Sequence, residues 1–295
     1  KILETEGVTG IYDDPATNEI VILVERPEHT RKVPEEVDGI RTRVIVTGTI
    51  RALDTVAAVP EALGQSGKVV YSRTTLQRPL FGGISLGNAG MPDGCGTLGL
   101  VVRGTGGGVF VLSNTHVLAM NRDGNLVPMG TEAWQPGGCD GGSSAGARVG
   151  ELSDYIPIDF TEGAVNTADA AIALLDDGVG YRPGQVLNAR NNGFYAVSGT
   201  TPVRPWNLVR KSGRTSGVSF GFVLSDSASV QVQYAEGKVA LFTDQILTTP
   251  MSQPGDSGSP VDRNRKLAGL LYAGSDTITV VCKTEHFVDP LGITI

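Results

Sequence analysis

The sequence predicts a mainly β protein that begins with a small α/β domain. Glycine accounts for 40 of the 295 residues, about twice its usual share, and only 6% of the residues are aromatic. From residue 96 onward the chain consists of short apolar runs separated by glycine turns, a pattern typical of turn-rich β proteins. The part of the chain before residue 79 does not follow this pattern. We therefore divide the chain into an accessory domain at 1–78 and a larger β domain at 79–295.

The accessory domain contains runs that predict strands and a helix. Residues 18–24 end in the five apolar residues 20–24 and predict a buried strand, whereas the alternating residues 40–46 predict a half-exposed strand. Residues 54–65 favour a short helix, and residues 69–71 favour another strand. Together these elements predict a small α/β domain.

The segment 73–94 has the composition of a linker between the two domains. It contains two prolines and five glycines, which are the residues that most often interrupt regular structure. The accessory domain contains no catalytic pattern, so its expected roles are binding, regulation or assembly. Formation of a homo-oligomer through this domain is one such expectation.

The charge and hydropathy of the chain argue against several kinds of partner. The net charge of −7 and the pI of about 5.0 argue against a nucleic-acid partner. No apolar run reaches the roughly 18 residues of a membrane-spanning helix, so we expect no membrane partner. No paired zinc-ligand spacing occurs, and we expect neither a metal nor a cofactor.

The three cysteines, Cys95, Cys139 and Cys282, are odd in number and widely spaced. This spacing does not suggest a disulfide framework. We interpret the cysteines as free thiols in a reducing compartment, which predicts a cytoplasmic protein. A secreted protein is the alternative, because a leader removed before Lys1 would leave the same sequence.

The segment 253–260, Gln-Pro-Gly-Asp-Ser-Gly-Ser-Pro, carries a candidate nucleophile. Glycines on both sides of Ser257 allow a sharp turn that projects the hydroxyl out of a tight loop. The amides of Gly255 and Ser257 are then expected to point into one concavity, which suits a developing oxyanion. A lone serine is a poor nucleophile, so the hypothesis requires a base and an orienting acid.

Two residues earlier in the chain are candidates for that base and acid. His116 follows the apolar run 109–112, which is predicted to form a hairpin with residues 98–102. Asp169 directly precedes an apolar strand, where a charged group must be hydrogen-bonded or paired. Taken singly, each has an ordinary alternative: a capped core histidine for His116 and a loop or cap residue for Asp169.

Together, three segments within 95–295 resemble the motifs of the chymotrypsin-like (trypsin-like) serine peptidases. They are Ser-Asn-Thr-His116-Val, Asp169-Ala-Ala-Ile-Ala-Leu-Leu and Gly255-Asp-Ser-Gly-Ser-Pro. Their order along the chain is histidine, aspartate, serine, as in the chymotrypsin arrangement. The resemblance implies two six-stranded antiparallel barrels with a cleft between them. It also implies His116 as the general base, Asp169 as its orienting acid, and the amides of Gly255 and Ser257 as an oxyanion hole.

A finer resemblance concerns the accessory domain and the stretch 126–142. Both are similar to a bacterial group of these peptidases that carries an N-terminal accessory domain. The plant proteases of the NARROW LEAF type look related to that group.

The same resemblance assigns positions around the cleft. Met251, six residues before Ser257, aligns with the position that is acidic in members that cut after lysine or arginine. Its apolar side chain favours an apolar residue before the cleaved bond, and ordinary loop packing is the alternative. The strand edge Tyr272-Ala273-Gly274 aligns with the wall of the specificity pocket, where its backbone would pair with an extended substrate.

Asp256 needs a cationic partner if it is buried. The resemblance to secreted bacterial members matches Lys211 to that role, and Arg214 is the second choice. We therefore expect a structural ion pair between Asp256 and Lys211.

The leading functional hypothesis is a serine endopeptidase that acts on protein or peptide substrates. One alternative is an esterase or acyl hydrolase that uses the same triad. Another is a scaffold protein that keeps a vestigial peptidase site and works through the domain at 1–78.

Overall fold

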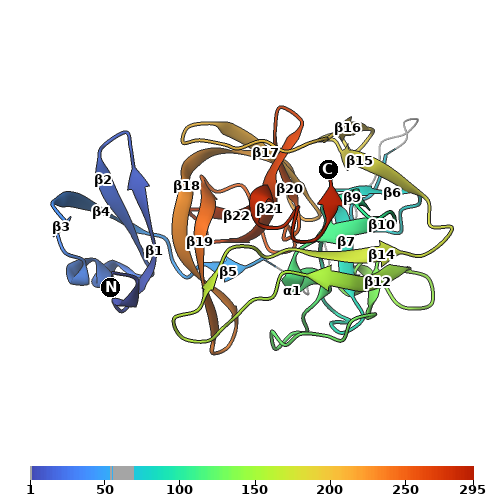
Figure 1. The fold of residues 1–295 in the computed structure, drawn as a ribbon, viewed down its shortest axis with the longest axis horizontal. Helices are drawn as coiled ribbons and strands as arrows, with labels where there is room; N and C mark the ends of the chain where they lie inside the picture. Colours follow the sequence, from blue (N-terminus) through green and yellow to red (C-terminus); the bar gives the residue numbers. More distant parts are fainter. Residues whose placement is uncertain (1, 54, 56–69) are drawn as a thin grey trace.

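The computed structural model describes residues 2–53, 55 and 70–295 of the chain. Strands dominate it, and the helices in this part of the chain are only three to six residues long (Figure 1). None of these helices has the length and apolar character to cross a membrane. The predicted mainly β class is confirmed.

A ring of strands between residues 84 and 175 forms the first barrel. In ring order its strands are β7 (Ile84–Asn88), β8 (Gly96–Leu98) continuing as β9 (Leu100–Gly104), β10 (Val109–Ser113), β14 (Ala171–Leu175), β12 (Arg148–Tyr155) and β11 (Glu132–Trp134). Only Gly99 separates β8 from β9, so one bent stretch of chain pairs with β7 at one end and β10 at the other. The short C-terminal strand β23 (Ile293–Thr294) pairs with β9.

A second ring forms the second barrel. In ring order its strands are β17 (Leu208–Gly213), β18 (Gly217–Ala235), β19 (Lys238–Thr248), β22 (Thr279–Lys283), β21 (Lys266–Gly274) and β20 (Pro260–Arg263), which pairs back to β17. The rings of Phe242 and Tyr272, 4.9 Å apart, are fully buried inside it. The two barrels lie side by side, with the green strands of the first next to the orange and red strands of the second (Figure 1).

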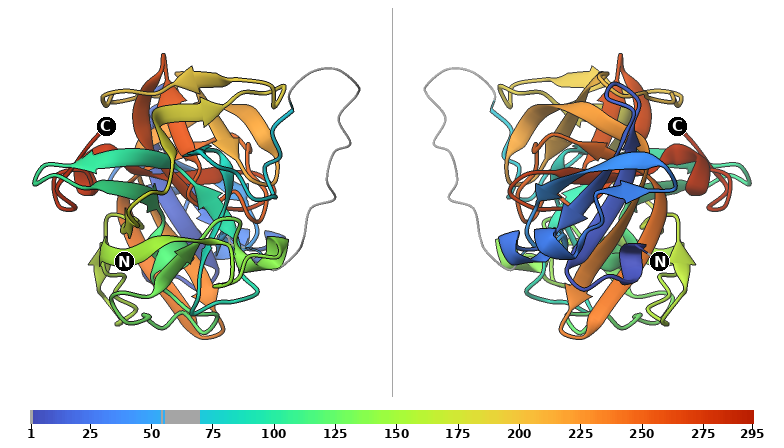
Figure 2. Two further views of the ribbon diagram at one scale, coloured as in Figure 1. Left: turned by 90° about the vertical axis from the view of Figure 1, so that its right-hand side faces the viewer. Right: turned by 90° about the vertical axis from the view of Figure 1, so that its left-hand side faces the viewer.

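The N-terminal strands extend the sheet of the second barrel. They are β1 (Val8–Asp14), β2 (Glu19–Val24), β4 (Ile40–Val46) and the short β3 (Glu36–Val37). β1 pairs with β18 through Gly10 and Val230, and these blue strands lie beside the orange ones (Figure 2). β2 and β4 confirm the strands predicted at 18–24 and 40–46. The helices described here, η1 (Ile2–Glu4) and η2 (Pro27–Lys32), are 3-10 turns, so an α/β domain is not seen.

The linker prediction for 73–94 is wrong. This segment contains β7 and β6 (Leu80–Gly82), and every residue of both strands is buried. β6 pairs with β15 (Tyr181–Leu187), which in turn pairs with β16 (Phe194–Ala196). The glycines serve close packing here, because a Cβ on Gly82 would lie 2.2 Å from the carbonyl oxygen of Gly99.

Other local predictions had mixed outcomes. The predicted hairpin of 98–102 with 109–112 is present as β9 and β10. The predicted helix at 54–65 lies outside the described residues apart from Thr55, which forms a β-bridge with Cys95. In the predicted strand at 69–71, residue 69 is also outside them, and Val70 and Tyr71 are not in a strand.

Replacing Gly99 by alanine is expected to lower the free energy of unfolding by about 1–3 kcal/mol through overpacking. A Cβ there would lie 2.6 Å from the carbonyl oxygen of Gly258 and 2.9 Å from that of Leu112. The matched control is Gly106→Ala in an exposed turn, where an added Cβ has no neighbour within 4 Å. Urea denaturation of both variants gives the comparison, and equal losses of stability would contradict the role of Gly99.

Candidate active site

The register of two neighbouring strands brings His116 and Asp169 together. Ser113 at the end of β10 pairs with Ala171 at the start of β14. The chain that leaves β10 and the chain that enters β14 therefore meet at one edge of the first barrel. His116 stands there on the short helix α1 (Thr115–Leu118), and its Nδ1 lies 2.5 Å from Asp169 Oδ2.

Asp169 is fully buried and accepts hydrogen bonds from three groups. Besides the imidazole, the His116 amide donates to Oδ1 at 3.2 Å, and the Tyr234 hydroxyl donates to Oδ2 at 2.8 Å. An ionised carboxylate only accepts hydrogen bonds, so His116 Nδ1 carries the proton of this pair. This arrangement selects one imidazole tautomer and leaves Nε2 as the proton acceptor of the ring.

Tyr234 is a residue of this site that the sequence analysis missed. Burial, together with the charge of Asp169, raises the pKa of its hydroxyl well above the usual range, so the hydroxyl remains a donor at neutral pH. Tyr234 lies near the C-terminal end of the long strand β18 and reaches across from the second barrel to the first. Only the packing of the two barrels creates this contact, and local sequence carries no signal for it.

The serine loop adopts the tight turn that its glycines suggested. Gly255 and Gly258 both have positive φ, +95° and +91°, in the region that favours glycine. Ser257 between them is buried. Its hydroxyl donates to the Tyr272 carbonyl at 3.1 Å and accepts from the Leu53 amide at 3.1 Å. Within the described part of the chain, no hydrogen bond joins Ser257 to His116.

The amides of Gly255 and Ser257 converge on one oxygen. Both donate to the carbonyl oxygen of Leu53, at 2.5 and 3.5 Å respectively. These are the two amides that were predicted to form an oxyanion hole. The sequence analysis did not anticipate Leu53, because its approach depends on a pairing between segments 204 residues apart.

Asp256 and Lys211 form a fully buried ion pair. Lys211 Nζ lies 2.8 Å from Asp256 Oδ2, and both side chains are 0% exposed. The amides of Thr215, Ser216 and Gln253 also donate to the Asp256 carboxylate. Burial lowers the pKa of Lys211, and the neighbouring carboxylate opposes that shift. Arg214, the second choice for this role, instead binds Asp140 at 2.6 Å.

The predicted substrate-binding residues lie around the serine. Met251 is buried in an apolar cluster with Leu53, Leu271 and Val281. Tyr272, Ala273 and Gly274 form the last residues of β21. The edge of this strand pairs with the two-residue strand β5 (Arg51–Ala52).

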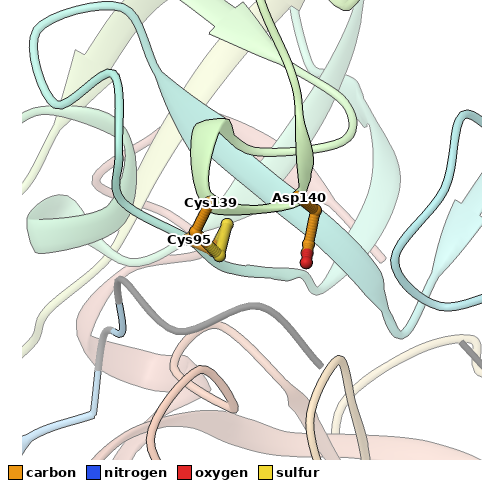
Figure 3. A group of neighbouring side chains, drawn as sticks. All are labelled: Cys95, Cys139 and Asp140. Carbon is orange, nitrogen blue, oxygen red and sulfur yellow. A yellow bond between two sulfur atoms is a disulfide. The ribbon is translucent and has the colours of Figure 1, made fainter. Parts of the chain in front are cut away.

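The prediction of free thiols is wrong for two of the three cysteines. Cys95 and Cys139 form a disulfide, with their Cα atoms 5.6 Å apart (Figure 3). Cys95 directly precedes β8 and Cys139 lies in the short helix η3 (Gly138–Asp140), so the fold joins residues 44 positions apart. Cys282 is a free buried thiol, and burial raises its pKa to about 12. The basis for a reducing compartment is therefore removed.

Two groups of side chains in the described residues have the spacing of metal ligands. The first is Cys95, Cys139 and Asp140, whose sulfurs are joined in the disulfide beside Asp140 (Figure 3). The second is Asp244, Glu285 and His286. Basic side chains form salt bridges with the aspartates of both groups: Arg214 binds Asp140, and Lys283 binds Asp244 at 2.5 Å.

The chain has the fold of the chymotrypsin-like serine proteases. Thermobifida fusca protease A matches it with a TM-score of 0.53 and 20% identity, over 72% of this chain and 96% of that one. The alpha-lytic protease homologue N4 matches with a TM-score of 0.54 and 18% identity, over 73% and 98%. A glutamic acid-specific serine protease matches with a TM-score of 0.53 and 18% identity, over 73% and 100%.

No family model matches the chain, and no curated protein matches its sequence. The finer resemblance to bacterial members with an accessory domain and to NARROW LEAF-type proteases stays a prediction. At identities of 20% or less the structural likeness establishes the fold, and the activity has to be inferred from the site.

Replacing Lys211 by methionine is expected to destabilise the protein by about 3–5 kcal/mol, because the Asp256 carboxylate would stay buried without its cation. The matched control is Arg204→Met, since the Arg204–Asp226 pair lies at the surface with the Arg204 side chain 76% exposed. That change should cost about 0–1 kcal/mol. Urea denaturation measures both, and a small loss for Lys211→Met would show that the buried pair is dispensable.

Two buried tyrosines provide a matched comparison of hydroxyl groups. Tyr234→Phe is expected to cost about 1.5–3 kcal/mol, because it removes a hydrogen bond to a charged carboxylate. The Tyr272 hydroxyl has no hydrogen-bond partner among the described residues, so Tyr272→Phe should leave stability unchanged or raise it. Thermal unfolding of the two variants tests this order, and a reversed order would refute the assigned hydrogen bonding.

Proposed function

We propose that the protein is a serine endopeptidase that cleaves protein substrates through an acyl-enzyme. The observation that carries this proposal is a pair of contacts. His116 is held by the buried Asp169 carboxylate, and the amides of Gly255 and Ser257 converge on a peptide carbonyl oxygen. That oxygen belongs to Leu53. The preceding residue, Ala52, lines a small pocket together with His116.

In the proposed mechanism Ser257 is the nucleophile. His116 takes the proton of the Ser257 hydroxyl as Oγ bonds to the substrate carbonyl carbon, and later gives this proton to the leaving amine. Asp169 holds the imidazole tautomer and stabilises the imidazolium that forms. The amides of Gly255 and Ser257 stabilise the oxyanion, where one such donor is typically worth about 3–4 kcal/mol.

The surroundings of the serine support an apolar residue before the cleaved bond. Met251 packs in a buried apolar cluster that includes Leu271 and Val281. We therefore propose Met251 as part of the specificity pocket, and the edge Tyr272–Gly274 as the strand that pairs with the substrate backbone. The resembling peptidases that cut after lysine or arginine carry an acid at the position where this chain has Met251.

The strand edge favours an endopeptidase over the alternatives. Backbone pairing along β21 recognises an extended peptide, which a simple ester does not provide. A vestigial site in a scaffold has no need for a buried carboxylate held by three donors around a histidine.

The disulfide between Cys95 and Cys139 favours an oxidising compartment, and we propose a location outside the cytosol.

Ser257→Ala is expected to lower peptide hydrolysis on the order of 10⁶-fold, since loss of the nucleophile disables the whole triad. Labelling by a fluorophosphonate probe should disappear as well, whereas the exposed-loop control Ser143→Ala should keep both activities. A peptide mixture read by mass spectrometry gives the cleavage rate. Hydrolysis by Ser257→Ala near the wild-type rate would refute the nucleophile, and ester hydrolysis without peptide cleavage would favour the acyl hydrolase.

A further inference from the structure

Residues 51–53 lie across the candidate cleft as an added strand. Ala52 pairs with Ala273 and Arg51 pairs with Gly274, antiparallel to the edge of β21. Addition of an extended segment to a sheet edge is a common way of recognising a peptide backbone. This edge is also the one assigned to substrate binding, so the chain covers its own substrate site.

The backbone of Leu53 contacts every group that would act on a cleaved bond except the imidazole. Its amide donates to the Tyr272 carbonyl at 3.1 Å and to the Ser257 hydroxyl at 3.1 Å. Its carbonyl oxygen accepts from Gly255 and Ser257. The carbonyl carbon of Leu53 therefore lies beside the nucleophile, with its oxygen already on the oxyanion donors.

The side chains of the same segment fit the two neighbouring subsites. Leu53 is 7% exposed and packs within the apolar cluster of Met251. One of its methyl carbons lies 3.3 Å from the place that a Cβ on Gly274 would occupy, so this glycine leaves room for the leucine. Ala52 faces the pocket that His116 and Tyr234 also line.

We propose that the protein cleaves its own chain at the peptide bond that follows Leu53. This inference rests on the proposed peptidase activity and deepens it, because it assigns leucine as the residue before the cleaved bond. The natural substrates would then carry leucine, or an aliphatic side chain of similar size, at this position.

The chemical steps balance with one molecule of water. Ser257 Oγ turns from the Tyr272 carbonyl, passes its proton to His116 and bonds to the Leu53 carbonyl carbon. The bond from that carbon to the next nitrogen breaks, and the leaving amine takes the proton from His116. Water, deprotonated by His116, then attacks the ester, which yields the Leu53 carboxylate and restores Ser257.

The cleaved segment is expected to remain in place. β1 stays paired with β18, and β2 stays paired with β1, without any need for the covalent connection after Leu53. The new carboxylate would therefore occupy the oxyanion site as a bound product. Activity toward other proteins then requires residues 51–53 to leave the edge of β21.

Intact-mass spectrometry of the purified full chain tests the cleavage. The wild-type protein should separate under denaturing conditions into two pieces, 1–53 and 54–295, that elute together from a native gel-filtration column. The Ser257→Ala protein should remain a single chain. Cleavage at a different bond, or equal cleavage of Ser257→Ala, would overturn the proposal.

A matched pair of substitutions tests the pocket. Leu53→Asp places a charge against the apolar cluster and should slow self-cleavage by about 100-fold or more, while Leu53→Met keeps size and apolar character and should stay within about 10-fold. Leu53→Asp should also free the cleft and speed the hydrolysis of added peptides that contain leucine. Circular dichroism of both variants controls for folding, and equal self-cleavage rates would refute the role of Leu53.

The outcomes separate this inference from the proposed function. An uncut wild-type chain that still labels with fluorophosphonate and hydrolyses peptides would overturn self-cleavage and leave the peptidase assignment intact. If the wild-type chain is uncut and unlabelled while the Leu53→Asp protein is labelled, self-cleavage would also be overturned. Residues 51–53 would then only block the active site. Failure of both proteins to label or hydrolyse would overturn the peptidase assignment itself.

Discussion

The contact of Thr97 with the serine loop joins the two barrels at the place where the site is built. The Thr97 amide donates to the Ser257 carbonyl at 2.7 Å, and its hydroxyl donates to the Gly255 carbonyl at 2.9 Å. The same hydroxyl accepts from the Arg214 amide. Thr97 belongs to the first barrel, which also carries His116, so these bonds set the serine loop relative to the imidazole. A shift of this junction by one ångström would be enough to spoil the alignment of a reacting pair.

Buried charge is the second constraint on the site. Asp256 stiffens the serine loop because Lys211 and three backbone amides bind its carboxylate from several directions. In the first barrel, the Asp169 carboxylate binds both the amide and Nδ1 of His116 and so fixes the position of the imidazole. A buried carboxylate tolerates few geometries once its donors are placed. Rigid geometry around a nucleophile is what pre-organised catalysis requires.

Sequence reasoning succeeded where a short segment determines its own conformation. The glycines around Ser257 predicted a turn with positive φ, and the apolar run at 18–24 predicted a strand. The order of histidine, aspartate and serine in the chain pointed to the two-barrel fold. These features depend on neighbours within a few residues, or on a motif that a single sequence displays.

Sequence reasoning failed where the decisive partner lies far along the chain. Cys95 meets Cys139, Tyr234 meets Asp169, and Leu53 meets Ser257 only because the barrels fold and pack as they do. The error at 73–94 has a related cause. Glycine marks both flexible chain and closely packed backbone, and composition does not distinguish the two.

The shared sheet of the N-terminal strands and the second barrel affects how the molecule can be divided. β18 pairs with β17, β19 and β1, so its stretch at Ser229 and Val230 has a neighbour supplied by the N-terminal strand β1. A shortened protein that begins near residue 79 would leave this stretch of β18 with open hydrogen-bonding groups. Such an edge invites pairing between molecules, and the truncated form would tend to aggregate.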